Sequence, residues 1–268
     1  MDMLHIIPTG GLCNRMRIIA SGIFLARKYN KTTIIHWNNT PGLSADFCHL
    51  FKTQMPPHTS IVENRNWLYN IDNTRQYVIR YPLLRSRCRV IYNYNRYANG
   101  NFSEKSCLLT GKDYMLIGCN SVDEHYNLHE LFVPTDNIQN RINQIISQYS
   151  STKTIGIHIR RTDNSQSIRR SPIEAFIKKI DEEISHDENV RFYLASDDDE
   201  VKQKFTRLYP DHIITHTDKL ERNSLEGMVF AVTELFCLSK TQKIIGSDYS
   251  SYSNIAAELG DIPVEFAR

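Results

Sequence analysis

The stretch TIGIHIRRTDN, residues 154–164, sets an apolar strand directly before a cluster of charged side chains. Successive side chains of a strand alternate between its two faces, so the three isoleucines should share one face and His158 and Arg160 the other. Arg161 would point the opposite way from Arg160. An apolar strand that ends in a charged loop is typical of a ligand site at the carboxyl edge of a parallel sheet.

The surrounding sequence supports this interpretation, because apolar strands and amphipathic helices alternate regularly after residue 151. The pattern predicts a doubly wound α/β domain over residues 151–268. The expected strands are 154–159, 191–196, 212–215 and 243–247, and the expected helices are 171–184, 198–209, 224–240 and 251–260.

The first half of the chain opens in the same way. The pattern predicts a strand–helix–strand unit of a second parallel sheet, with strand 3–8, a glycine-bearing turn, helix 15–30 and strand 32–37. Strand 114–119 and helix 135–150 follow, whereas residues 48–101 give no clear pattern. The polar run at 149–153 predicts a boundary that divides the chain into domains 1–150 and 151–268.

Charge and composition exclude several classes of protein. Lys and Arg number 32 against 30 Asp and Glu, so no overall field attracts nucleic acid or an anionic membrane. The cysteines and histidines show no metal-ligand spacing, and we expect no metal site. The apolar run at the N-terminus is too short for a signal peptide or a membrane span, which predicts a cytoplasmic protein without an integral membrane segment.

Two further strand ends carry polar side chains. Asp197–Asp199 follow strand 191–196 and open a helix, where carboxylates cap free N–H groups. Asp197 comes first, and its carboxylate could accept hydrogen bonds from a guanine base; a metal-binding D-x-D motif is the alternative. Ser250, Ser251 and Ser253 follow strand 243–247, and their hydroxyl groups could bind a phosphate or cap the next helix.

These motifs together resemble a known family. HIRRTDN is similar to the H-x-R-R-x-D motif of the α1,2-, α1,6- and protein O-fucosyltransferase superfamily, and GGLCNRM, residues 10–16, is similar to its N-terminal glycine loop. YLASDDDEV and GSDYSSYSNIA resemble its second and third motifs, in the same order. The resemblance implies a bacterial-type enzyme with an α/β GT-B fold, in which two Rossmann-like domains have a cleft between them. Domain 1–150 would face the acceptor, and domain 151–268 would bind a GDP-sugar.

The resemblance also implies roles for single residues. Arg160 would contact the β-phosphate and stabilise the departing GDP, supported by His158. The α1,6 enzymes have a glutamate after the arginine motif, and the corresponding SQSIRRS here has no carboxylate, which leaves Asp163 and Glu174 as the nearest candidate bases. The β-phosphate itself could instead take the proton. The donor-binding residues would be Asn14, Arg15, Arg161, Asp197, Ser250 and Ser251.

The implied reaction is an inverting, metal-independent transfer of fucose from GDP-fucose, which serves as co-substrate without a further cofactor. Its acceptor would be a glycan or a polysaccharide precursor, and a lipid-linked precursor at the inner membrane face is one candidate. Two related alternatives are a transferase that uses another GDP-sugar and a sugar-nucleotide-binding protein without turnover.

A third alternative belongs to another class of protein. The segment 73–103 has no acidic residue and interleaves arginines with tyrosines, a pattern that can follow a nucleic-acid backbone and stack bases. Because the chain as a whole is nearly neutral, we favour the GDP-sugar site and expect no nucleic-acid partner.

Overall fold

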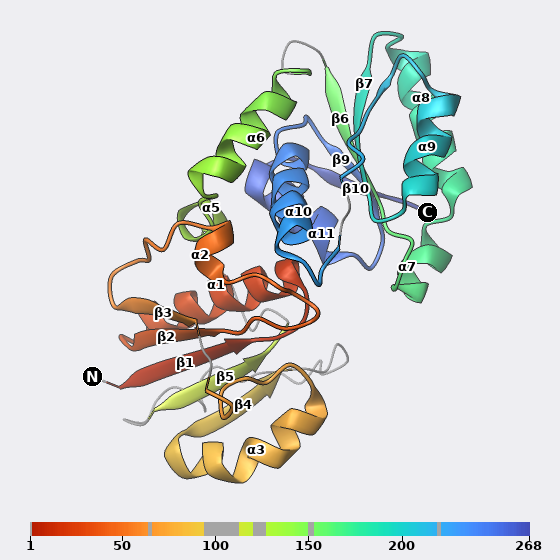
Figure 1. The fold of residues 1–268 in the computed structure, drawn as a ribbon. Helices are drawn as coiled ribbons and strands as arrows, with labels where there is room; N and C mark the ends of the chain where they lie inside the picture. The colour runs from red at the N-terminus through yellow and green to blue at the C-terminus, as the bar shows by residue number, and fades with distance from the viewer. Residues whose placement is uncertain (1, 64–65, 94–112, 120–126, 150–152, 219–220) are drawn as a thin grey trace. The chain divides into compact units, whose positions relative to one another are not determined.

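The computed structural model describes residues 2–63, 66–93, 113–119, 127–149, 153–218 and 221–268. These residues form two α/β units, each built on a five-stranded parallel sheet (Figure 1). The first unit comprises residues 1–135 and 222–225, and the second comprises residues 136–221 and 226–268.

The first unit has strands in the order β3-β2-β1-β5-β4. Helix α1 packs on one face of this sheet, where a Cβ added to Gly22 would lie 2.5 Å from Ile6 Cδ1. Leu84 of α3 packs on the other face, in a cluster with Ile7 and Ile117. The elements are β1 (Met3–Pro8), α1 (Leu12–Lys28), β2 (Thr32–Trp37), α2 (Phe47–Leu50), β3 (Thr59–Glu63), α3 (Thr74–Arg87), β4 (Arg89–Asn93), β5 (Tyr114–Gly118) and α5 (Leu128–Leu131).

The second unit has strands in the order β10-β9-β6-β7-β8, and its first strand in the chain, β6, lies at the centre. The chain therefore runs outward from β6 to one edge, returns, and continues from β9 to the other edge. The elements are α6 (Asp136–Ile146), β6 (Thr154–Ile159), α7 (Ser165–Arg170), α8 (Ile173–His186), β7 (Arg191–Ser196), α9 (Asp199–Leu208), β8 (Ile213–Ile214), α10 (Leu225–Leu238), β9 (Ile244–Ser247), α11 (Ser251–Gly260) and β10 (Val264–Ala267).

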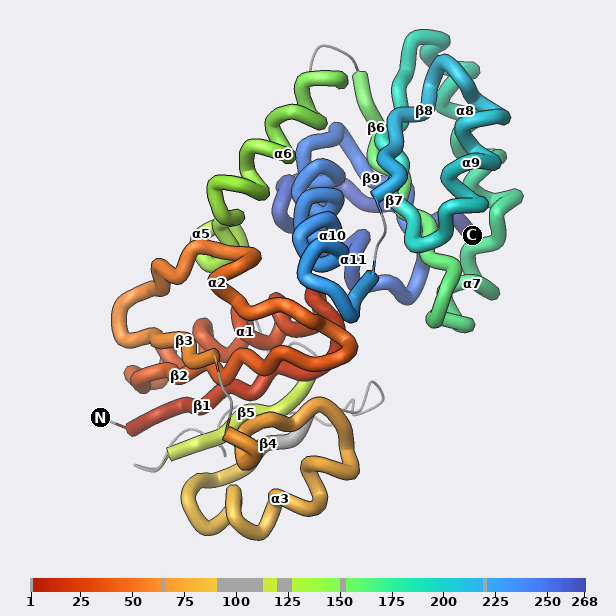
Figure 2. The backbone as a smooth tube through the Cα atoms, viewed as in Figure 1, coloured from red at the N-terminus to blue at the C-terminus, as the bar shows by residue number. Residues whose placement is uncertain are grey.

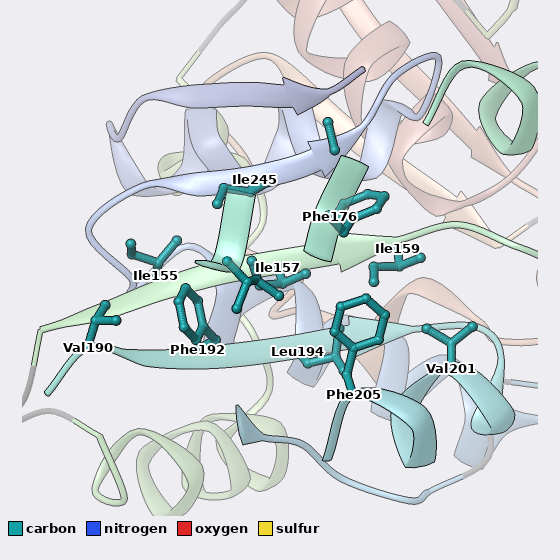
Figure 3. Packing of buried hydrophobic residues seen from close by; sticks show 12 residues of the cluster. Ile155, Ile157, Ile159, Phe176, Val190, Phe192, Leu194, Val201, Phe205 and Ile245 are labelled. Atoms are coloured by element: carbon teal, nitrogen blue, oxygen red, sulfur yellow. The ribbon is translucent and has the colours of Figure 1, made fainter. Parts of the chain in front are cut away.

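Helices cover both faces of the second sheet (Figure 2). The three isoleucines of β6 belong to one apolar cluster with Phe176 of α8 and Phe205 of α9, and Figure 3 shows Ile159 beside these two rings and Ile155 near Phe192. On the opposite face a Cβ added to Gly156 would lie 3.0 Å from Leu238 of α10. The alternation predicted for β6 is therefore confirmed, and the burial of both faces explains why the strand is apolar along its whole length.

Helix α6 belongs to the second unit, whereas the sequence pattern placed the boundary after residue 150. The contacts around this helix explain the difference. The Tyr149 hydroxyl donates to the Cys237 carbonyl oxygen at 2.8 Å, and the Arg141 guanidinium lies 5.9 Å from the ring centre of Phe230. Both partners lie on α10.

Candidate functional site

Three chain segments leave the carboxyl edge of the second sheet side by side. β6 pairs with β7 through Ile159 and Ser196, and with β9 through His158 and Gly246. The strand order reverses between β6 and β9, and open α/β sheets bind their ligands at such a reversal. The segments that begin at Arg160, Asp197 and Asp248 thus meet at the position where a ligand is expected.

Arg160 lies at the centre of this edge and is held from two sides. Its Nη1 lies 2.8 Å from Asp197 Oδ2, and its Nη2 donates to Asp163 Oδ1. The Arg160 backbone N–H also donates to Ser247 Oγ at 2.9 Å, which joins the loops after β6 and β9. The guanidinium side chain is 16% exposed, so one part of it reaches solvent while the rest is fixed by the protein.

The Asp197 carboxylate accepts hydrogen bonds from the loop after β6 and so fixes its conformation. Its Oδ1 accepts from the Arg161 backbone N–H at 2.7 Å, and its Oδ2 accepts from the hydroxyl and backbone N–H of Thr162. Burial alone would raise the pKa of this carboxyl, but the charge of Arg160 and these hydrogen bonds outweigh burial and hold its pKa below the usual value. Both carboxylate oxygens therefore have partners within the chain. The role of Asp197 as a reader of guanine stays a prediction.

His158 is buried beneath this loop and is 5% exposed. Its Nδ1 lies 2.7 Å from Ser253 Oγ, and its ring stacks on Tyr252 with centroids 4.8 Å apart. Burial, opposed by the charge of Asp197 and assisted by that of Arg160, lowers the pKa of His158 to about 3. The imidazole is therefore neutral at physiological pH, and it supports the site by packing and hydrogen bonding.

Arg161 points away from Arg160, as the strand alternation predicted. Its Nη2 donates to the Ser171 carbonyl oxygen, and its guanidinium carbon lies 6.0 Å from the ring centre of Phe176. Arg161 thereby anchors the end of α7 to the loop after β6. The two adjacent arginines differ in environment because successive residues leave the strand on opposite sides.

The third segment leads into α11, a ten-residue helix. Ser250 occupies the N-cap position without a side-chain capping bond, and it is 7% exposed, whereas Ser251 is half-buried. Tyr249 precedes them with a φ of 60°, and its carbonyl oxygen accepts from Asn164 Nδ2 at 2.9 Å. The backbone thus presents the first turn of α11 beside the loop that holds Arg160, an arrangement that suits an anion.

Asp248 is a buried carboxylate directly after β9 whose partners the sequence did not predict. It is 6% exposed, and its Oδ2 lies 3.0 Å from Arg268 Nε and 3.6 Å from Arg170 Nη1. Arg170 also lies over the ring of Tyr249, at 4.5 Å from the centroid. The position of an aspartate directly after a strand was the available signal, but its partners come from α7 and the last residue of the chain.

A buried ion pair between α9 and α10 was also missed. Lys202 Nζ lies 3.1 Å from Glu234 Oε1, and neither side chain is more than 2% exposed. Burial raises the pKa of Glu234 to about 7, although the charge of Lys202 acts to lower it. Lys202 Nζ also donates to the His216 carbonyl oxygen at 2.8 Å. In the sequence both residues look like ordinary polar positions of amphipathic helices, so nothing pointed to this pair.

The glycine loop of the first unit lies between β1 and α1. Gly10 has a φ of 77°, which favours glycine. Arg15 is fully buried, and its guanidinium donates to the carbonyl oxygens of Gly10 and Asn38 and to Thr40 Oγ1. These contacts are to the protein, and the expected role of Arg15 in donor binding stays a prediction. Asn14 is half-buried, and its Oδ1 accepts from Arg17 Nη2 at 3.1 Å.

The two remaining acids of the D-x-D alternative lie at the start of α9. Asp198 Oδ1 accepts from the backbone N–H groups of Glu200 and Val201 and caps α9, and Asp199 lies in the first turn of that helix. Among the described residues, no three His, Cys, Asp or Glu side chains gather so that they could hold a metal ion. In the same part of the chain, no helix is both long and apolar enough to cross a membrane.

The sequence matches no protein-family profile and no curated protein. Its structure, however, is similar to solved fucosyltransferases. The α-1,6-fucosyltransferase NodZ from Bradyrhizobium, in a crystal soaked with GDP-fucose, has a TM-score of 0.64 and 15% identity over 97% of this chain and 93% of NodZ. A mutant of Arabidopsis thaliana FUT1 in complex with GDP has a TM-score of 0.65 and 14% identity, over 99% of this chain and 70% of that one.

A third similar structure is POFUT1 in complex with GDP, which has a TM-score of 0.58 and 12% identity over 99% of this chain and 98% of POFUT1. At these identities the likeness shows the fold. The expected fold class is therefore confirmed: this is an α/β protein with two parallel-sheet domains, matching the GT-B structures of NodZ and POFUT1.

Proposed function

We propose that this protein is an inverting, metal-independent glycosyltransferase of the fucosyltransferase superfamily. It transfers fucose from GDP-fucose to a hydroxyl group of a glycan or polysaccharide precursor and needs no cofactor. The observation that carries the proposal is the position of Arg160, a fixed and partly exposed cation at the point where the strand order of the second sheet reverses. The similar structures that contain GDP or GDP-fucose support the choice of donor.

The reaction places a definite demand on Arg160. The bond from fucose C1 to the β-phosphate oxygen breaks, its electron pair leaves with GDP, and C1 forms a bond to the acceptor oxygen. Negative charge therefore grows on the β-phosphate as the transition state forms. A cation held in place by the protein stabilises this charge more in the transition state than in the bound donor.

The two carboxylates around Arg160 differ in exposure, and this difference suggests how a phosphate is admitted. Asp163 is 54% exposed, whereas Asp197 is 10% exposed. Exposed ion pairs contribute about 0–1 kcal/mol, so a diphosphate can replace Asp163 at little cost. Asp197 then keeps the guanidinium in place. The released Asp163 carboxylate is our candidate for the base that takes the acceptor proton, with the β-phosphate as the other proton acceptor.

The other proposed site residues either bind the donor or hold the loops of the site in position. We assign Ser250 and Ser251 to the diphosphate, because they begin α11 next to the loop of Arg160. His158, neutral and bonded to Ser253, and Arg161, bonded to Ser171, hold the two sides of that loop. Asn14 is assigned to the donor sugar. Arg15, which is fully buried, would act by fixing the carbonyl oxygen of Gly10 in the glycine loop.

We further propose that the first unit, which contains most of residues 1–150, forms the acceptor side and that the second unit, which contains most of residues 151–268, forms the donor side. The enzyme would act in the cytoplasm. If its acceptor is a lipid-linked precursor, the enzyme would bind peripherally to the inner membrane face to reach it.

Isothermal titration with GDP, GDP-fucose, GDP-mannose and UDP tests the donor site, with and without EDTA. We expect guanine-selective binding that survives EDTA and collapses in Arg160→Ala. The matched control is Arg169→Ala, which removes an exposed arginine whose partner is Gln166. Absence of guanine preference, or binding that requires a divalent ion, would contradict the proposal.

Turnover separates the remaining alternatives. Release of GDP from GDP-fucose in the presence of an acceptor glycan identifies a fucosyltransferase. Faster turnover of GDP-mannose identifies a transferase for another GDP-sugar, and binding without turnover across an acceptor panel identifies a binding protein.

A further inference from the structure

The outward face of α3 carries large apolar side chains that the protein leaves in water. Val78, Ile79 and Leu83 are 61%, 63% and 50% exposed. Residues 78 and 82, and 79 and 83, are one helical turn apart and lie side by side on the helix surface. Val78, Ile79, Pro82 and Leu83 thus form a continuous band, here called the α3 strip. On the other side of the helix Leu84 is fully buried against the sheet.

Arginines surround the α3 strip. Arg75, Arg85 and Arg87 on the helix and Arg89 just after it are all exposed. The sequence has no Asp or Glu between Asp72 and Glu104. The two described acids nearest in sequence have partners in other parts of the first unit.

Asp72 Oδ1 lies 4.0 Å from Arg15 Nη2, and Asp113 Oδ1 accepts from the Met3 backbone N–H at 2.9 Å. The charged side chains of α3 itself are therefore all positive, and the acids lie at its ends: Asp72 precedes the helix, and the Arg89 backbone N–H donates to the Asp113 carbonyl oxygen at 2.9 Å.

A tryptophan extends the same kind of surface. Trp67 is 56% exposed, and the Arg80 guanidinium carbon lies 5.4 Å from its ring centre. Arg80 Nη1 also donates to the Asn70 carbonyl oxygen, so the segment before α3 is tied to the helix. Tryptophan and arginine beside exposed aliphatic side chains are characteristic of protein surfaces at the boundary between lipid and water.

We propose that the α3 strip and its arginines dock on an anionic membrane surface. The aliphatic side chains would enter the boundary between headgroups and acyl chains, while the arginines extend to the lipid phosphates. The complementary charge of an anionic leaflet identifies the partner. A second copy of this chain would instead bring two all-positive surfaces together, which opposes self-association through this face.

The same contacts argue against nucleic acid as the partner. Tyr77 and Tyr81 are half-buried and pack on each other with ring centroids 5.3 Å apart, so their faces are not presented to bases. Tyr94, Arg96 and Tyr97 of the sequence pattern lie outside the described residues. The exposed side chains at the centre of the surface are aliphatic, and a sugar–phosphate backbone would leave them in water.

The consequence for catalysis rests on the function proposed above: membrane docking would bring the enzyme to a lipid-linked acceptor. The docking itself is measured without donor or acceptor, so its failure would leave the GDP-binding test untouched. Conversely, failure of GDP binding would leave the vesicle result standing.

Co-sedimentation of the full chain with vesicles tests the proposal, using phosphatidylcholine alone and phosphatidylcholine mixed with phosphatidylglycerol. We expect salt-sensitive binding to the mixed vesicles only. The variants Ile79→Ser/Leu83→Ser and Arg85→Ser/Arg87→Ser should each weaken that binding at least about tenfold. The α9 controls are Leu208→Ser, which removes an apolar side chain that is 49% exposed, and Lys204→Ser/Arg207→Ser, which removes two exposed cations; both should bind like wild type.

Several outcomes would overturn the proposal. Wild type would fail to bind anionic vesicles, or it would bind neutral vesicles equally well. Alternatively, the α9 controls would lose as much vesicle binding as the α3 variants. Retention on an oligonucleotide without vesicle binding would point to nucleic acid, and a change in oligomeric state on replacing Ile79 and Leu83 would point to a second copy. Circular dichroism checks the fold of each variant. If Ile79→Ser/Leu83→Ser is unfolded, the vesicle binding of Arg85→Ser/Arg87→Ser alone tests the proposal.

Discussion

Arg160 Nη1 lies 2.8 Å from Asp197 Oδ2, and this ion pair connects the ends of two neighbouring strands, β6 and β7. The same carboxylate accepts the backbone N–H groups of Arg161 and Thr162. One aspartate therefore fixes both the cation of the proposed donor site and the loop that carries it. This relationship gives Asp197 a role that does not depend on contact with a ligand.

Replacing Asp197 by asparagine should reduce kcat about 100-fold or more while leaving the protein folded. Asn retains one acceptor oxygen for the loop but removes the charge that holds Arg160. Steady-state release of GDP from GDP-fucose gives kcat and KM. The control is Asp199→Asn in the first turn of α9. A change confined to the KM for the guanine nucleotide would support base reading by Asp197 instead.

Acid should destabilise the wild-type protein through His158. Its pKa is lowered to about 3 in the folded state and returns to about 6.5 in the unfolded chain. The unfolded state therefore binds more protons between these values, and the free energy of unfolding contributed by this residue should fall as pH drops from about 6.5 to about 3. The loss approaches about 1.4 kcal/mol for each pH unit by which the folded and unfolded pKa values differ.

The variant His158→Gln, unfolded by denaturant at a series of pH values, tests this prediction. Its stability should depend less steeply on pH over that window than the stability of wild type. His36, with a pKa lowered to about 4 by burial and by the neighbouring His5, still contributes to the slope in the variant. His212→Gln serves as the control, and an unchanged slope in His158→Gln would contradict the neutral, buried imidazole.

Gly246 should not tolerate a side chain. A Cβ there would lie 2.4 Å from Ser253 Oγ and 2.6 Å from Ser253 Cβ, well inside contact distance. We expect Gly246→Ala to lower the free energy of unfolding by about 1–3 kcal/mol, the usual cost of overpacking. Thermal unfolding measures it, with Gly42→Ala as the control because a Cβ at Gly42 meets nothing closer than 4.0 Å.

A compensating change sharpens the test. Ser253→Gly removes both atoms in question, but it also removes the hydroxyl that pairs with His158 Nδ1, so the single variant Ser253→Gly is the reference. Adding Gly246→Ala to Ser253→Gly should cost less free energy of unfolding than adding it to wild type, and an equal cost would show that the clash with Ser253 is not the cause.

Arg15 should not be replaceable by lysine. Its guanidinium makes hydrogen bonds in three directions while fully buried, and an ammonium group cannot reproduce this planar geometry. Leaving buried acceptors without donors costs about 1–3 kcal/mol each, so Arg15→Lys should lower the midpoint of thermal unfolding by several degrees. Arg27→Lys, on the exposed end of the same helix, should unfold like wild type. Equal midpoints for both variants would contradict this role.

The sequence was most informative where side chains alternate on regular strands. Strands 3–8, 32–37, 154–159 and 191–196 have the predicted bounds in the structure. Residues 48–101 were least informative, and they contain β3, α3 and β4. Helix α3 was missed because it has Pro82 in its interior and apolar side chains on both its buried and its exposed faces, so no single-faced pattern marks it.

By itself the sequence determined that the second half of the chain is a doubly wound α/β unit with charged side chains after three of its strands. Local periodicity is enough for this, because each strand and helix must bury its own apolar face.

The tertiary structure alone decided the partners and the burial of the charged side chains. It brings residues 160, 197 and 247 together across neighbouring strands, buries Arg15, and pairs Lys202 with Glu234 from helices that are far apart in the chain. The burial and hydrogen-bond partners of a charged group depend on elements distant in sequence. Its pKa and its role are therefore properties of the folded molecule.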